Sequence, residues 1–146
     1  MNTLLTPTEI YNLAFGAEEN FNLSSVRESD IAVAESRYLL PIIGEELYAV
    51  LMEGDYADMC KEYVAPMVAA WTRYIVEPLL TERCGQSHGT AAVDRRVVAH
   101  LRAMAMTQSR RLSDYLNDHT DEYSEYNPVD NPLNHCTIDG NIVQIY

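Results

Sequence analysis

Apolar residues recur at intervals of three and four along most of the chain, which is the pattern of amphipathic α-helices. A first helix is predicted to begin at Thr6, because Thr6 can cap it, Pro7 suits the first helical position and Glu9 completes a capping box. A second apolar face runs over residues 31–40. Pro41 then predicts a break, because the residue before a proline is biased away from the α conformation.

The middle of the chain predicts one long helix, which begins after Asp55 and reaches Cys84. Its residues 63–76 are apolar on nearly every side. A helix of this kind lies at the centre of a bundle or in an oligomer interface. Pro66 and Pro78 are expected to kink or split it.

A last helix is predicted from Thr90 or Ala91 to about Asn117. Its expected buried stripe is Val93, Val97, Leu101, Met104, Gln108, Leu112 and Tyr115. Its other faces hold five arginines, and no acidic residue occurs between the first and the last of them: Arg95, Arg96, Arg102, Arg110 and Arg111. Two interpretations stay open for these arginines. They form either a docking strip for an acidic segment, its own or a neighbour's, or an ordinary solvated helix face.

The composition changes after the last helix. Residues 118–135 contain five acidic residues, two prolines and no basic residue, which predicts an extended or disordered segment. An Asp-Gly pair between β-forming residues predicts a short β-hairpin near 136–145. Three tyrosines of this region have no helical stripe to join, and we expect them to be interface anchors: Tyr123, Tyr126 and Tyr146.

Together these patterns predict an all-α fold, a bundle of four to five helices with an extended C-terminal tail. The helical domain is expected over 1–117 and the acidic tail, with its terminal hairpin, over 118–146. A chain of 146 residues has the length of one domain and can bury a core without a disulfide or a metal.

The charge limits the partners that this protein can have. The formal net charge is −12, from one Lys and nine Arg against 22 acidic residues. Nucleic-acid binding needs a basic footprint, so we expect no sequence-specific nucleic-acid partner. No run of about 18 apolar residues is present, so no membrane span is expected. The N-terminus lacks the pattern of a secretory signal, which favours a cytoplasmic protein.

Catalytic patterns are weak throughout. The cysteines Cys60, Cys84 and Cys136 fit no disulfide framework or zinc spacing and are interpreted as reduced thiols. The Cys84–His88 loop could pair a thiol with an imidazole, but its Gly-bearing sequence is more typical of a helix end. A chance metal site at His135-Cys136 with Asp139 is a weaker alternative. We therefore expect a non-enzymatic protein without a cofactor, a metal or a small-molecule substrate.

One stretch points to a family. Residues 30–48, DIAVAESRYLLPIIGEELY, predict a helix, an apolar corner at Gly44 and a second helix. The long apolar helix and the arginine-bearing helix follow. In pattern and helix order, residues 3–115 resemble the small all-α head–tail connector (adaptor) proteins of tailed bacteriophages and prophages, especially those of gut Bacteroidetes elements. The corner from Tyr38 to Tyr48 is the most distinctive part of this resemblance.

The resemblance implies a structural virion protein. In that family, copies form a ring beneath the portal of the filled capsid, and an extended segment clasps the portal or the next component. The implied partners are further copies of the chain, the portal and tail-completion proteins. The implied location is the bacterial cytoplasm during assembly and the virion neck afterwards, with residues 118–146 as the clasp. The alternative that remains open is a small helical protein-binding or regulatory module of a bacterial host.

Overall fold

The protein is all-α, as the sequence predicts, apart from two short C-terminal strands. A computed structural model describes residues 2–15, 23–83, 94–139 and 142–145. The α-helices are α1 (Pro7–Ala14), α2 (Glu28–Ala34), α3 (Leu40–Met52), α4 (Ala57–Met59), α5 (Ala65–Val76), α6 (Leu80–Arg83) and α7 (Arg95–Asp118). Tighter or wider turns join them: η1 (Leu23–Ser25), η2 (Glu35–Leu39), η3 (Cys60–Val64), η4 (Glu77–Leu79) and η5 (Pro132–Asn134).

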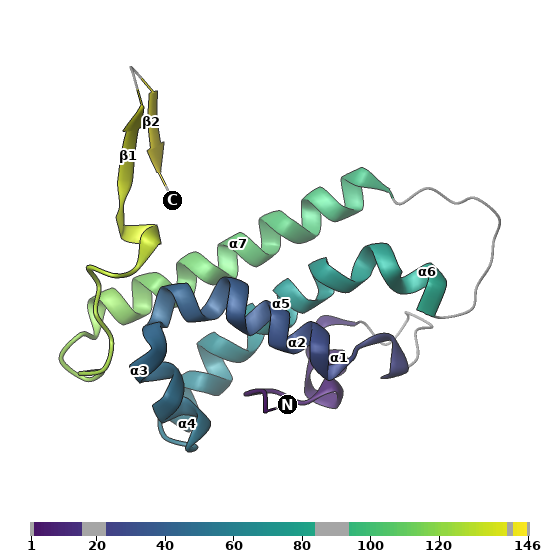
Figure 1. Ribbon diagram of the computed structural model, residues 1–146, viewed down its shortest axis with the longest axis horizontal. Helices are drawn as coiled ribbons and strands as arrows, with labels where there is room; N and C mark the ends of the chain where they lie inside the picture. The colour runs from purple at the N-terminus through teal and green to yellow at the C-terminus, as the bar shows by residue number, and fades with distance from the viewer. Residues whose placement is uncertain (1, 16–22, 84–93, 140–141, 146) are drawn as a thin grey trace.

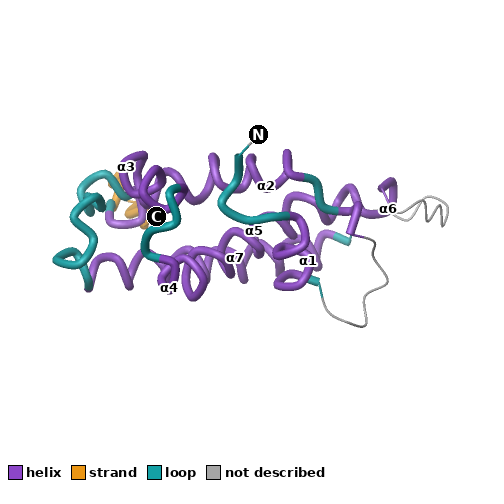
Figure 2. The backbone as a smooth tube through the Cα atoms, turned by 90° about the horizontal axis from the view of Figure 1, so that it is seen from below, coloured by secondary structure: helices purple, strands orange, loops and turns teal. Residues whose placement is uncertain are grey.

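Helix α5 lies at the centre and packs against α1, α2 and α7 (Figures 1 and 2). Eight of its residues are buried, as its apolar composition predicts. Trp71 is the main anchor. Its ring stacks on Tyr38 at a centroid separation of 3.7 Å, and its Nε1 donates a hydrogen bond to Ser109 Oγ of α7 at 2.8 Å.

Two single π-turns interrupt the helices, and a proline follows each one closely. In η2 the Leu40 amide donates to the Glu35 carbonyl, and in η3 the Ala65 amide donates to the Cys60 carbonyl. Pro41 and Pro66 follow at once. A proline has no N–H, and its ring clashes with the carbonyl four residues earlier. The wider turn makes room for the ring, so the helix passes through each proline.

The predicted break at Pro41 is therefore wrong. Leu40 has helical angles, φ −55° and ψ −41°, and α3 continues past the proline. The chain changes direction three residues later at Gly44, whose angles are φ 82° and ψ 163°. This left-handed φ costs glycine little, because glycine has no Cβ. The apolar corner expected at this glycine is present.

A buried carboxylate holds the N-terminal segment. Thr6 and Glu9 form the predicted capping box of α1. Just before it, the Leu4 amide donates to Glu35 Oε1 at 2.7 Å, and Tyr48 Oη donates to Glu35 Oε2 at 2.7 Å. Glu35 is 1% exposed. Burial raises its pKa above the usual carboxyl value, and the hydrogen bonds from Tyr48 and Leu4 oppose that rise.

The segment 119–135 is not the extended or disordered tail that its composition suggests. It folds in turns against α7, and Tyr123 and Tyr126 join the core. Asn131 is fully buried and donates its amide to Ser113 Oγ at 2.8 Å and to Tyr126 Oη at 2.9 Å. Aromatic burial and a satisfied polar network outweigh the acidic composition, since the acids themselves stay at the surface. The same hydrophobic core therefore continues across residue 117, where the sequence suggested a boundary between the helical domain and the tail.

The chain ends in antiparallel strands β1 (Cys136–Asp139) and β2 (Ile142–Ile145), which project from the helical body (Figure 1). The register pairs Cys136 with Ile145 and Ile138 with Val143. The turn at 140–141 lies outside the described residues. Among the helices that are described, none has both the length and the apolar character that a bilayer crossing requires.

Candidate functional site

The N-terminal half of α7 is the most exposed part of the helical body. Asp94 caps the helix by accepting a hydrogen bond from the Arg96 amide at 2.9 Å. Buried positions of the helix begin only at Ala105. Val97 is 41% exposed and Met104 is 51% exposed. The expected buried stripe through Val97 and Met104 is therefore wrong in this half.

The buried stripe of α7 instead runs through small and apolar residues: Ala105, Ser109, Leu112, Ser113 and Leu116. Two of them are serines, which do not stand out as core residues in the sequence. Their hydroxyls accept hydrogen bonds from Trp71 and Asn131. Small side chains let α5 approach closely, and this explains why the larger apolar residues lie beside the contact.

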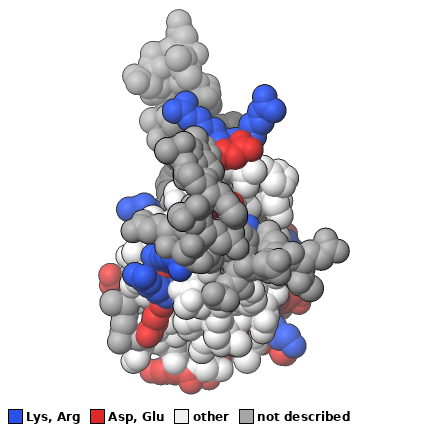
Figure 3. Space-filling model, turned by 90° about the vertical axis from the view of Figure 1, so that its right-hand side faces the viewer, with Lys and Arg blue, Asp and Glu red and all other residues white. Residues whose placement is uncertain are grey.

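Four of the five predicted arginines point into solvent. All four side chains are exposed, and none makes an ion pair or a hydrogen bond with another residue in the described parts of the chain: Arg95, Arg96, Arg102 and Arg110. Figure 3 looks onto the end of the molecule at which α7 begins, and basic side chains stand out there. Residues 95–111 of α7 hold only basic charges, although the chain as a whole has a net charge of −12.

Arg111 is exposed as well, with 44% of its side chain accessible, but unlike the other four it has partners within the described chain. Its Nη1 donates to the Glu62 carbonyl at 3.0 Å, its Nη2 lies 3.7 Å from the Glu62 carboxylate, and its guanidinium lies over the Tyr63 ring. The Glu62 carbonyl needs this donor because Pro66, four residues later, has no N–H. Arg111 therefore braces α7 against the π-turn η3.

Tyr123 and Tyr126 are not interface anchors either. Each is 5% exposed. Tyr123 shares a 2.8 Å hydrogen bond with Tyr115 Oη, and Tyr126 Oη donates to Asn117 Oδ1 at 2.6 Å. Burial and the bond to Tyr115 raise the pKa of Tyr123 above its ordinary value. The third predicted anchor, Tyr146, lies outside the described residues.

Charge is divided sharply along α7. Residues 95–111 hold five arginines and no acid, while residues 112–146 hold no lysine or arginine and seven acids. The first turn of α7 contains no acidic residue and the last turn no basic one. The helix macrodipole favours the opposite arrangement, acids at the N-terminus and bases at the C-terminus. Apart from the Asp94 cap, the charges at the two ends of α7 therefore do not stabilise the helix through its dipole.

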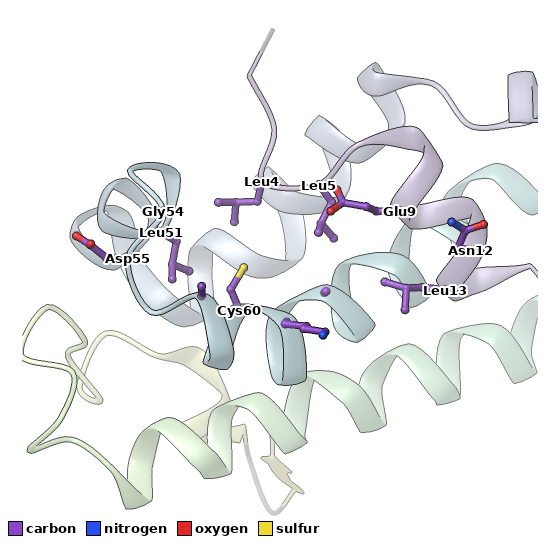
Figure 4. Close-up of a pocket in the computed structure, with 12 residues that line it drawn as sticks. Leu4, Leu5, Glu9, Asn12, Leu13, Leu51, Gly54, Asp55 and Cys60 are labelled. Atoms are coloured by element: carbon purple, nitrogen blue, oxygen red, sulfur yellow. The ribbon is translucent and has the colours of Figure 1, made fainter.

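A separate apolar groove lies on the other side of α5, between the N-terminal segment, α1 and α4 (Figure 4). Its volume is about 570 Å³, and Leu4, Leu13, Leu51 and Cys60 are among its lining residues. Burial, with smaller contributions from nearby carboxylates, raises the pKa of the Cys60 thiol. The thiol is therefore protonated near neutral pH and is a weak nucleophile.

The described residues contain no group of three His, Cys, Asp or Glu side chains that could hold a metal ion. The Cys84–His88 loop lies outside them, so its suggested thiol–imidazole pair has no structural description. The described surface offers cations without partners among the described residues, exposed apolar side chains and a separate acidic end.

Comparison of the chain with protein-family models, with curated proteins and with solved structures finds no significant match.

Proposed function

We propose that this protein is a structural subunit without catalytic activity, a head–tail connector of a tailed bacteriophage or prophage. In this role, copies assemble into a ring beneath the portal and bind the portal and tail-completion proteins. The observation that supports the proposal best is the exposed positive surface of α7, formed by Arg95, Arg96, Arg102 and Arg110. Four exposed cations without partners among the described residues, in a chain of net charge −12, favour contact with an acidic protein surface.

The overall charge agrees with this role. A ring of strongly acidic subunits would repel DNA in its channel, so that DNA could pass without adhering. The location that follows from the proposal is the bacterial cytoplasm during assembly and the virion neck afterwards.

The test is native mass measured over a concentration series, with particles imaged in parallel. A large closed ring is the expected result. A protein that stays monomeric or dimeric at every concentration would contradict the ring.

That result would favour the second candidate, a small helical protein-binding or regulatory module of a bacterial host. The groove of about 570 Å³ beside Cys60 is the observation in favour of this candidate. It is the kind of apolar concavity into which a partner's side chains can insert.

A further inference from the structure

A second apolar groove opens on the face where α1 approaches α7. Leu13 of α1, Ala69 and Ala70 of α5, and Leu101 and Met104 of α7 line it, and its volume is about 180 Å³. Leu13 is 54% exposed and Met104 is 51% exposed. In the described part of the chain, no element covers these side chains. A groove with two such exposed side chains at its edge is suited to receive an apolar group.

A buried polar atom in the same groove also lacks a partner. Gln108 lines the groove, and its Oε1 is buried without a hydrogen-bond donor among the described residues. Buried acceptors in native proteins are almost always satisfied. The group that fills the groove should therefore bring an N–H or an O–H as well as apolar surface.

Cations flank the groove on α7. Arg96 and Arg102 each lie about 120° around the helix from Gln108 in the groove, on opposite sides of it. Neither arginine has an ion-pair partner in the described ranges. The positive rim selects for a partner that is acidic around its apolar group. We call the groove with Arg96 and Arg102 the basic groove.

The opposite end of the same molecule has this chemistry. Val129 is 70% exposed, the highest value among the large apolar residues that the structure exposes. Asp130 follows it and lines a pocket together with Glu45, Glu46 and Glu125. No lysine or arginine occurs after Arg111. We call Val129 and Asp130, together with Glu45 and Glu46 of the pocket that Asp130 lines, the acidic knob.

From this complementarity we infer that the basic groove of one copy receives the acidic knob of a second copy. Val129 enters beside Leu13 and Met104, while Arg96 and Arg102 face Glu45, Glu46 and Asp130. A polar hydrogen from the 127–130 turn or its surroundings reaches Gln108. The groove and the knob are different surfaces of one chain, so the contact is heterologous. Repetition of such a contact gives a closed ring or an open filament and not a two-fold dimer.

This inference rests on the proposed self-assembly and specifies its contact, so the test separates the two. One variant combines Arg96→Glu with Arg102→Glu, and the other combines Glu45→Arg with Asp130→Arg. Each variant alone should raise the concentration at which the protein associates by about tenfold or more, because two charge pairs become repulsive. An equimolar mixture should restore association, since the reversed groove fits the reversed knob and the unchanged surfaces fit each other.

The apolar half of the contact has its own test. Val129→Asp should weaken association by about tenfold, because a carboxylate would enter an apolar groove. Val33→Asp is the matched control, since Val33 is 41% exposed on α2, away from both surfaces, and should behave as wild type. Arg27→Glu with Arg37→Glu controls for net charge. Circular dichroism should show the wild-type helix content in every variant.

The outcomes distinguish the two proposals. If rings form and neither charge variant alters their formation, the connector proposal stands and this contact is wrong. If both variants fail and their mixture does not recover, the two surfaces do not meet and the inference is overturned. A wild-type chain that is monomeric at every concentration overturns the contact and the ring together.

Discussion

The two halves of α7 share one continuous helix but have opposite surroundings. In the C-terminal half, Leu112 and Leu116 are fully buried, and residues 119–135 fold back over the helix. In the N-terminal half, Val97 and Met104 are exposed beside arginines that have no partner among the described residues. Both halves are amphipathic in sequence. The comparison shows that periodicity determines that a helix forms, whereas the elements that pack against it determine which of its faces is core.

The difference also separates stability from interaction. The C-terminal half contributes buried area and a polar network through Ser113, Asn131 and Tyr126. The N-terminal half contributes exposed charge and apolar surface, and its charges oppose the helix dipole. Changes in the C-terminal half should therefore alter folding, and changes in the N-terminal half should alter assembly.

Removal of the same kind of side chain from each half gives the largest contrast. Leu112→Ala should lower the free energy of unfolding by about 3 kcal/mol, because it leaves a cavity in the core. Met104→Ala should change it by less than about 0.5 kcal/mol, because Met104 is half exposed. Urea unfolding measures both. Equal losses would mean that the N-terminal half is covered after all.

The polar anchor of the C-terminal half is the next largest contribution. Asn131→Ala should cost about 2 kcal/mol, because Ser113 Oγ and Tyr126 Oη each lose an amide donor and the partly buried Leu133 amide loses its acceptor. Asn127→Ala, at an exposed position nearby, should cost less than about 0.5 kcal/mol. Amide hydrogen exchange should show faster exchange over 119–135 in the first variant. Unchanged protection there would contradict the anchoring role.

Alkaline pH tests the same region through Tyr123. The folded state favours its neutral phenol, so its pKa is raised above the ordinary value of 10.0. The stabilisation is complete below that ordinary pKa and is lost as the pH rises above it. Tyr123→Phe should cost about 1 kcal/mol at pH 8 through the lost bond to Tyr115. It should also reduce the fall in unfolding free energy between about pH 10 and 12, and an unaltered fall would refute the assignment.

Substitutions at the neighbouring residues Arg110 and Arg111 should have different effects on stability, although the two arginines have equivalent roles in the sequence prediction. Arg111→Gln should cost about 1 kcal/mol, because the Glu62 carbonyl loses its donor and Tyr63 loses its stacked cation. Arg110→Gln should be neutral within about 0.5 kcal/mol. Thermal unfolding of the two variants side by side is sufficient, and identical melting temperatures would remove Arg111 from its bracing role.

The smallest expected effect has an unusual sign. Arg95→Glu with Arg96→Glu should stabilise the monomer by about 0.5–1 kcal/mol at low salt, because anions replace cations at the helix N-terminus. High salt should remove most of this gain. Measurements at concentrations below association isolate the effect. A destabilised monomer would show that these arginines have folding partners.

The sequence predicts the local features of this fold better than its long-range contacts. Thr6, Pro7 and Glu9 specify the start of α1 through contacts within one turn, and the apolar composition of 63–76 identifies the central helix. These signals depend on residues close together in the chain, so they can be recognised from the sequence. The four exposed arginines of α7 lie at the surface, as both interpretations of the sequence expect.

The errors concern contacts between distant segments. Composition cannot show that Tyr126 and Asn131 find Ser113 on α7, and without that contact an acidic segment with two prolines suggests disorder. Arg111 and Arg110 look equivalent until the Glu62 carbonyl is seen beside one of them. The groove at Gln108 needs α1 and α7 to be brought together, and no single stretch of sequence contains it.

The π-turn η3 has a consequence for how the chain can change in length. It holds one more residue than an α-turn does, and that residue accommodates Pro66. Loss of one residue from Cys60–Val64 would return the turn to α spacing without rotating the helices on either side, but Pro66 would then clash. The extra residue of the π-turn and Pro66 are therefore expected to be gained or lost together. A homologue that is one residue shorter here is expected to lack the proline too.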